Sequence, residues 1–171
     1  SRRRPGAARE QETGIPSVAT TVSEFVDTTV RGMLKRGVHT EADIQSSIKA
    51  LLLAADIGLD EDGVLLEDPM GDGSKRRIDI RFGQAIIETK RNLTQTDLTA
   101  ALEQLTGYVA TRSSAYGVPF IGILTDGRDW RLYDLIDDEL TLVSSLVLTD
   151  PDTAADRLIV WLESALATKP D

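Results

Sequence analysis

Two short apolar segments, separated by a glycine-containing dipeptide, constrain the fold of this chain more than any other feature. They are Arg77–Phe82 and Ala85–Lys90, and Gly83-Gln84 separates them. Runs rich in β-branched residues on either side of a glycine-containing dipeptide are typical of two strands joined by a tight turn. The sequence therefore predicts a β-hairpin over these segments.

Three charged residues lie within this hairpin: Asp79, Glu88 and Lys90. Side chains alternate across a strand, so Glu88 and Lys90 share one face, which Asp79 reaches if the register allows. Mg²⁺ prefers oxygen ligands, commonly one or two carboxylates with waters and a substrate phosphate. Asp79, Glu88 and the backbone carbonyl of Thr89 could supply such ligands, and Mn²⁺ would be able to replace Mg²⁺. Lys90 would then orient a water molecule or stabilise negative charge in phosphodiester hydrolysis.

The same charges also have a purely structural interpretation. Lys90 is the only lysine of the chain with an acidic residue two positions before it. An isolated charge in an apolar run is costly to bury, so it needs a partner or a metal. A surface hairpin with Glu–Lys or Asp–Arg cross-strand pairs would meet that need equally well. The motif alone leaves both interpretations open.

The order of elements around the motif resembles the PD-(D/E)xK nuclease superfamily, and most of all the N-terminal nuclease domains of type I and related restriction subunits. The core of that family runs helix, three strands, helix, strand, flanked here by helical extensions. The matching elements are a helix over Glu41–Ala55, a strand near Val64–Glu67, the two motif strands, a helix over Gln95–Thr111 and a strand at Phe120–Thr125. Ile78 stands where the proline that gives the family its name would be. The resemblance covers roughly residues 40–135 and implies an α/β fold with a restriction-endonuclease-like mixed sheet.

Further details of the sequence fit this resemblance. They are the helix start Thr40-Glu41, the pair Gln104 and Tyr108 on the second helix, and Leu124–Gly127 followed by the aromatic strand Trp130–Tyr133. The resemblance implies a magnesium-dependent DNA endonuclease of a restriction or phage-defence system. Its catalytic residues would be Asp79, Glu88, Lys90 and Glu41, with Asp79, Glu88 and Thr89 at the metal. Gln104 and Tyr108 would contact the substrate.

Each supporting residue has an alternative role. Thr40 and Asp43 have the spacing of a helix capping box, and Glu41 in the first turn favours the helix dipole, so Glu41 could be structural. Gln104 and Tyr108 are neighbours on one helix face, outside the stripe of Leu98, Leu102, Leu105 and Val109. Tyr108 could be a buried tyrosine whose hydroxyl bonds locally.

The hairpin region differs in charge from the rest of the chain. The chain has 28 acidic and 19 basic residues and a net charge of −9, whereas strong nucleic-acid binders are usually basic. Residues 73–91 nevertheless carry +4, from Lys75, Arg76, Arg77, Arg81, Lys90 and Arg91 against two acids. We predict that Arg76, Arg77, Arg81 and Arg91 contact phosphates. Alternatively, Lys75–Arg77 only solvates a strand edge.

Composition and organisation narrow the remaining possibilities. The chain has no cysteine, and its single histidine, His39, predicted to be an exposed loop residue, excludes a multi-histidine zinc site. No apolar run is long enough to span a membrane, so we expect a cytoplasmic protein without a membrane partner. We predict a flexible arm over 1–16, a helix within 17–37, the nuclease core over 38–150 and a C-terminal helix and tail over 151–171.

Three functions are compatible with the sequence. In the first, the chain cleaves DNA and belongs to a larger protein whose other domains or subunits deliver the DNA. In the second, it is a non-catalytic DNA-binding or assembly module with the same fold, which the intact Asp79, Glu88 and Lys90 disfavour. In the third, it is an acidic α/β interaction domain, which would be favoured if those three residues pointed to different places.

Overall fold

The computed structural model describes residues 18–35, 39–55, 64–66, 80–94 and 96–167 of the chain. The described elements follow the chain in the order α1 (Val18–Met33), α2 (Glu41–Ala54), β1 (Val64–Leu66), β2 (Ile80–Phe82), β3 (Ala85–Thr89), α3 (Leu98–Tyr116), β4 (Ile121–Thr125), β5 (Asp129–Ile136), β6 (Glu139–Val147) and α4 (Pro151–Ala167).

The described strands form one mixed sheet of six strands, in the order in which they occur along the chain. Neighbouring strands are antiparallel, with the exception of β3 and β4, which are parallel and connected through α3. A parallel pair needs such a crossover because a tight turn can only reverse the chain. The mixed α/β fold predicted from the sequence is confirmed.

The turn between β2 and β3 has the form that the sequence predicts. Phe82 pairs with Ala85 across the two-residue loop, and Ile80 pairs with Ile87. Gly83 has a φ of 61°, which a residue without a Cβ adopts at little cost. Residues 77–79, predicted to belong to the first motif strand, lie outside the described residues.

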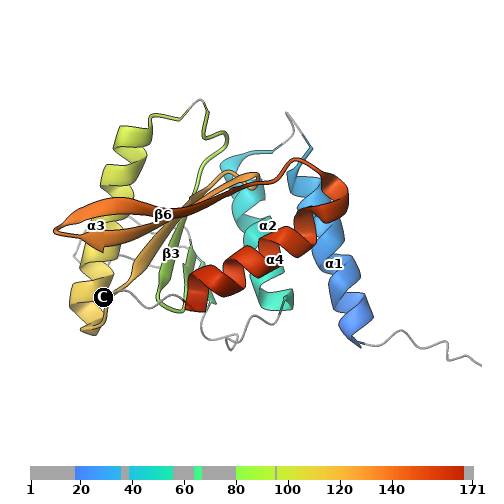
Figure 1. Ribbon diagram of the computed structural model, residues 1–171, viewed down its shortest axis with the longest axis horizontal. Coiled ribbons are helices and arrows are strands. Elements are labelled where there is room, and N and C mark those ends of the chain that lie inside the picture. The colour runs from blue at the N-terminus through green and yellow to red at the C-terminus, as the bar shows by residue number, and fades with distance from the viewer. Residues whose placement is uncertain (1–17, 36–38, 56–63, 67–79, 95, 168–171) are drawn as a thin grey trace, which may run out of the picture.

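Each face of the sheet buries its own hydrophobic core, and Figure 1 shows helices on both sides of the sheet. The helices α1, α2 and α4 cover one face, and α3 covers the other. At the α3 face, a Cβ added to Gly122 on β4 would lie 3.0 Å from Leu105 Cδ2, so glycine allows the helix to approach closely. At the opposite face, α1 and α4, the two helices expected as extensions, pack on the same core as α2.

Two side chains of α1 differ in burial: Phe25 is 41% exposed, whereas Met33 is buried. His39, expected to be exposed, is half-buried, and its Nε2 lies 2.6 Å from the Gly32 carbonyl oxygen. This contact ties the start of α2 to the end of α1.

Within the described ranges, no helix combines the length and apolar character needed to cross a membrane.

The start of α2 is fixed by a capping box, as predicted from the spacing of Thr40 and Asp43. The Thr40 hydroxyl accepts a hydrogen bond from the Asp43 backbone N–H, and the Asp43 carboxylate accepts one from the Thr40 N–H. Both N–H groups would otherwise lack a partner at the helix end. The capping box sets the position of Glu41, the first residue of the helix.

We expect this capping box to make stability depend on pH. The hydrogen bonds from Thr40, chiefly from its backbone N–H, lower the pKa of Asp43 below its usual value. Stability from a carboxylate with a lowered pKa is present above its unfolded-state pKa of about 4 and is lost as pH falls through the folded value. Asp43→Asn should therefore lower the melting temperature slightly at pH 7, and the difference should shrink below pH of about 4. Thermal unfolding across this range, with the exposed Glu163→Gln as control, measures it; a difference that does not change with pH would contradict it.

Candidate functional site

The end of β3 brings a buried carboxylate and an ammonium group together. Glu88 is only 3% exposed, and its Oε2 lies 3.3 Å from Lys90 Nζ, whose side chain is 21% exposed. Ile86 belongs to the core beneath α3, so alternation along the strand places Glu88 on that same face. A carboxylate this deeply buried is costly without a nearby positive charge. The predicted proximity of Glu88 and Lys90 is thus present, and their charges do not point to different places.

A cleft of about 770 Å³ lies beside this pair. Because β3 and β4 are parallel, the segments that follow them meet at the same end of the sheet, where they face the start of α2. The cleft is lined by Met33, Lys35, His39, Glu41, Ile44, Lys90, Arg91, Asn92, Thr94, Thr96, Asp126, Arg128, Asp129 and Val147. Glu41 and Lys90, both predicted site residues, therefore share one cleft. Glu88 does not line it, although its carboxylate contacts Lys90.

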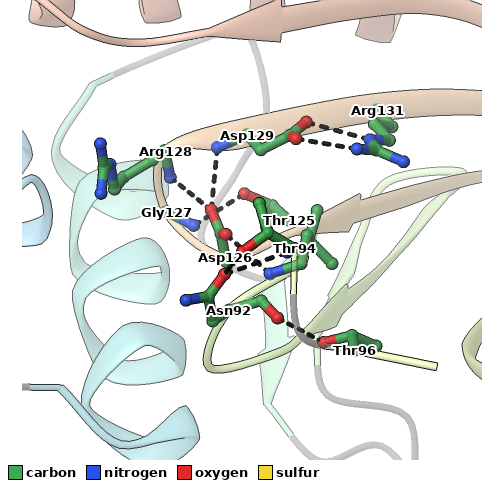
Figure 2. Close-up of polar contacts among 10 residues, drawn as sticks. Asn92, Thr94, Thr96, Thr125, Asp126, Gly127, Arg128, Asp129 and Arg131 are labelled. Carbon is green, nitrogen blue, oxygen red and sulfur yellow. Dashed lines mark hydrogen bonds and ion pairs between the residues drawn. The ribbon is translucent and has the colours of Figure 1, made fainter. Parts of the chain in front are cut away.

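Asp126 organises the wall of this cleft, as Figure 2 shows. Its Oδ2 accepts a hydrogen bond of 2.9 Å from the backbone N–H of Leu93, in the loop after β3. Its Oδ1 accepts bonds of 3.0 and 2.9 Å from the N–H groups of Arg128 and Asp129, in the turn after β4. One buried carboxylate thus joins the two loops. The backbone N–H of Lys90 adds a bond of 2.9 Å to the Thr125 carbonyl.

The loop after β3 is also held by its own polar residues. Asn92 Oδ1 accepts hydrogen bonds from both the N–H and the hydroxyl of Thr94, and the Asn92 carbonyl accepts one from the Thr96 hydroxyl. These bonds are drawn in Figure 2. Because the amide oxygen receives two donors, the Asn92 NH₂ group is turned the other way.

Of the predicted substrate residues that the structure describes, Gln104, Tyr108 and Arg81 do not line the cleft, whereas Arg91 does. Tyr108 is 1% exposed within the core beneath α3, and its hydroxyl accepts a 2.6 Å hydrogen bond from Gln104 Nε2. The prediction that Tyr108 lies outside the apolar stripe of the helix is wrong, because close packing of α3 widens the buried strip. Arg81 is half-buried, with its guanidinium 5.2 Å from the centre of the Tyr116 ring. Arg91 is exposed and does line the cleft.

Three predicted site residues, Asp79, Arg76 and Arg77, lie outside the described residues. Of the predicted Mg²⁺ ligands, only Glu88 and Thr89 can therefore be compared with the structure. The described residues include no group of three or more His, Cys, Asp or Glu side chains suited to a metal. Of the two predicted carboxylate ligands, the described residues include only Glu88, which is buried beside Lys90.

The sequence did not single out Asp126 as more than part of a hairpin turn. It does occupy that turn, with Gly127 at a φ of 91°, but its carboxylate also holds the loop 33 positions earlier in the chain. One signal could have pointed to Asp126: it is a polar residue directly after a buried strand, and that strand is parallel to the motif strand. Ligand sites gather at the carboxyl ends of parallel strands.

No protein-family model, no curated protein and no solved structure matches this chain.

Proposed function

We propose that this chain is a magnesium-dependent DNA endonuclease with a restriction-endonuclease-like core of the PD-(D/E)xK type. The observation that carries the proposal is the pair formed by buried Glu88 and Lys90 at the end of β3, next to a cleft that also contains Glu41. A carboxylate and an ammonium group beside an open cleft are suited to hydrolysis of a phosphodiester. A module without catalysis would have no need for Asp79, Glu88 and Lys90 together.

The order and direction of the elements support the same proposal. The helix α2 precedes three antiparallel strands, and α3 then leads to a strand parallel to β3. This is the helix, three strands, helix, strand order of the superfamily that the motif resembles. The strands β5 and β6 and the helices α1 and α4 would be additions to that core.

Asp79 is the proposed second carboxylate. It immediately precedes Ile80 in the sequence, and Ile80 pairs with Ile87, the residue before Glu88. In an antiparallel pair, continuation of that register would bring Asp79 opposite Glu88. Two carboxylates and the Thr89 carbonyl would form a donor set suited to Mg²⁺, which keeps several waters and uses few protein ligands.

The residues would divide the chemistry between them. Asp79, Glu88 and Thr89 would hold Mg²⁺, or Mn²⁺ in its place, and the ion would acidify a water molecule and polarise the phosphoryl oxygen. Lys90 would orient the attacking water or stabilise negative charge on the phosphate. Glu41, across the cleft, would position water at the site.

The proposed biological setting is a restriction or phage-defence protein. With a net charge of −9, the chain alone is expected to bind DNA weakly. Other domains or subunits of the protein would then bring the DNA to the cleft.

Plasmid cleavage tests the proposed function. Supercoiled plasmid should be converted to nicked or linear DNA in the presence of Mg²⁺ or Mn²⁺ and remain intact in excess chelator. Asp79→Ala should abolish cleavage, because the proposed metal site would lose one of its two carboxylates and with it half of its negative charge. Asp156→Ala, an exposed acid on α4, is the matched control and should cleave normally. Cleavage that survives Asp79→Ala would reject the assigned site.

A further inference from the structure

The cleft beside Glu88 and Lys90 contains more charges than the proposed hydrolysis uses. Besides Lys90, it is lined by the cationic residues Lys35, Arg91 and Arg128 and by the acidic residues Glu41, Asp126 and Asp129. Counted formally, these opposite charges nearly balance. Their hydrogen bonds, however, divide them into two different groups.

Two of the acids are fully engaged within the protein. Asp126 accepts its three hydrogen bonds from backbone N–H groups. Asp129 accepts two from Arg131, at 3.0 and 2.9 Å, and Figure 2 shows this parallel arrangement. The hydrogen bonds to Asp129 raise the pKa of Arg131 above the usual guanidinium value. Arg131 is therefore paired with Asp129, and neither Asp126 nor Asp129 forms an ion pair with Lys35, Arg91 or Arg128.

Three cationic side chains of the cleft differ from Arg131 in this respect. Among the described residues, none forms a hydrogen bond or ion pair with the side chain of Lys35, Arg91 or Arg128. Asp126 binds only the backbone of Arg128, and in Figure 2 the Arg128 side chain extends away from that carboxylate. The NH₂ group of Asn92 adds an uncharged donor to the same wall, since Thr94 occupies its oxygen. The cleft therefore presents donors and positive charge on a framework fixed by Asp126.

We propose that Lys35, Arg91 and Arg128, with Asn92, form a subsite for backbone phosphates of the DNA strand whose cleavage is proposed above. The inference rests on that proposed function and adds Lys35, Asn92 and Arg128 to the predicted Arg91. Guanidinium groups bind phosphate oxygens through two parallel hydrogen bonds, whereas Lys35 acts as a point charge. Such contacts position a strand without reading its sequence.

The salt dependence of DNA binding tests this subsite. The Glu88→Gln protein, in which cleavage should be blocked, is titrated with a fluorescent DNA duplex at several salt concentrations. Each lost phosphate contact on B-form DNA should reduce the slope of log affinity against log salt by about 0.9. Arg91→Ala and Arg128→Ala should each reduce the slope by about that amount, and the double variant by about 1.8.

Two further variants separate lost charge from lost structure. Arg128→Lys keeps the positive charge and should keep the slope, although affinity falls because bidentate binding is lost. Arg157→Ala removes an exposed cation of α4 outside the cleft and should leave both quantities unchanged. A double alanine variant with unchanged slope would overturn the subsite, even if the wild-type protein cleaves plasmid. Binding through these arginines without any cleavage by the wild-type protein would support the subsite and reject the nuclease.

Discussion

Cleavage is expected to fall at least about a hundredfold when Glu88 is replaced by glutamine, while the protein stays folded. The amide of glutamine has nearly the same shape as the carboxylate but carries no charge to hold a divalent cation. The substitution leaves Lys90 without this partner. Removing one member of a fully buried ion pair usually destabilises by about 3–5 kcal/mol. Lys90 is 21% exposed, so its ammonium can turn to water and the cost should be much smaller.

Rates from single-turnover plasmid cleavage and melting temperatures measured on the same preparations test this expectation. Lys90→Ala should lose cleavage to a similar extent, since the proposed chemistry needs both groups. Glu103→Gln, an exposed acid on α3, serves as the matched control and should change neither quantity. Full cleavage by Glu88→Gln would place the active site elsewhere. Unfolding of that variant would make the pair structural.

The second large effect is expected from Asp126→Ala, which should lower the free energy of unfolding by about 2–4 kcal/mol. The substitution removes the acceptor for three backbone N–H groups, and one of them, that of Leu93, is buried. Leaving a buried donor without a partner costs about 1–3 kcal/mol, and the other two N–H groups can partly rehydrate. Asp126→Asn should also destabilise, because its NH₂ group must face one of these donors.

Urea unfolding measures this change. Asp134→Ala provides the control: it removes an acid from β5 whose side chain makes no hydrogen bond to another described residue. Because Asp126 joins the loop of Lys90 and Arg91 to the turn of Arg128, DNA affinity should fall in Asp126→Asn even where the variant remains folded. A variant as stable as the unchanged protein would show that water replaces the carboxylate without cost.

Much of the described fold could be predicted from local sequence patterns. Strand alternation and the Gly83 turn predict the β2–β3 hairpin, and the spacing of Thr40 and Asp43 predicts the start of α2. The face of α3 was predicted less well. The sequence predicts that Tyr108 lies beside the apolar stripe of the helix. In the structure, α3 packs closely against Gly122 and Tyr108 belongs to the core. How much of a helix is buried depends on the surface against which it packs.

The sequence by itself determined the elements, their order and the proximity of Glu88 and Lys90, because each of these depends on residues that are close along the chain. Only the tertiary structure decided which charged side chains of the cleft are hydrogen-bonded within the protein. Asp126 meets Leu93 because β3 and β4 are parallel neighbours, which brings together two loops 33 residues apart. The same pairing places Arg91 and Arg128 on one cleft with Glu41. Contacts between distant residues depend on how strands are paired in the sheet, and no local pattern encodes that pairing.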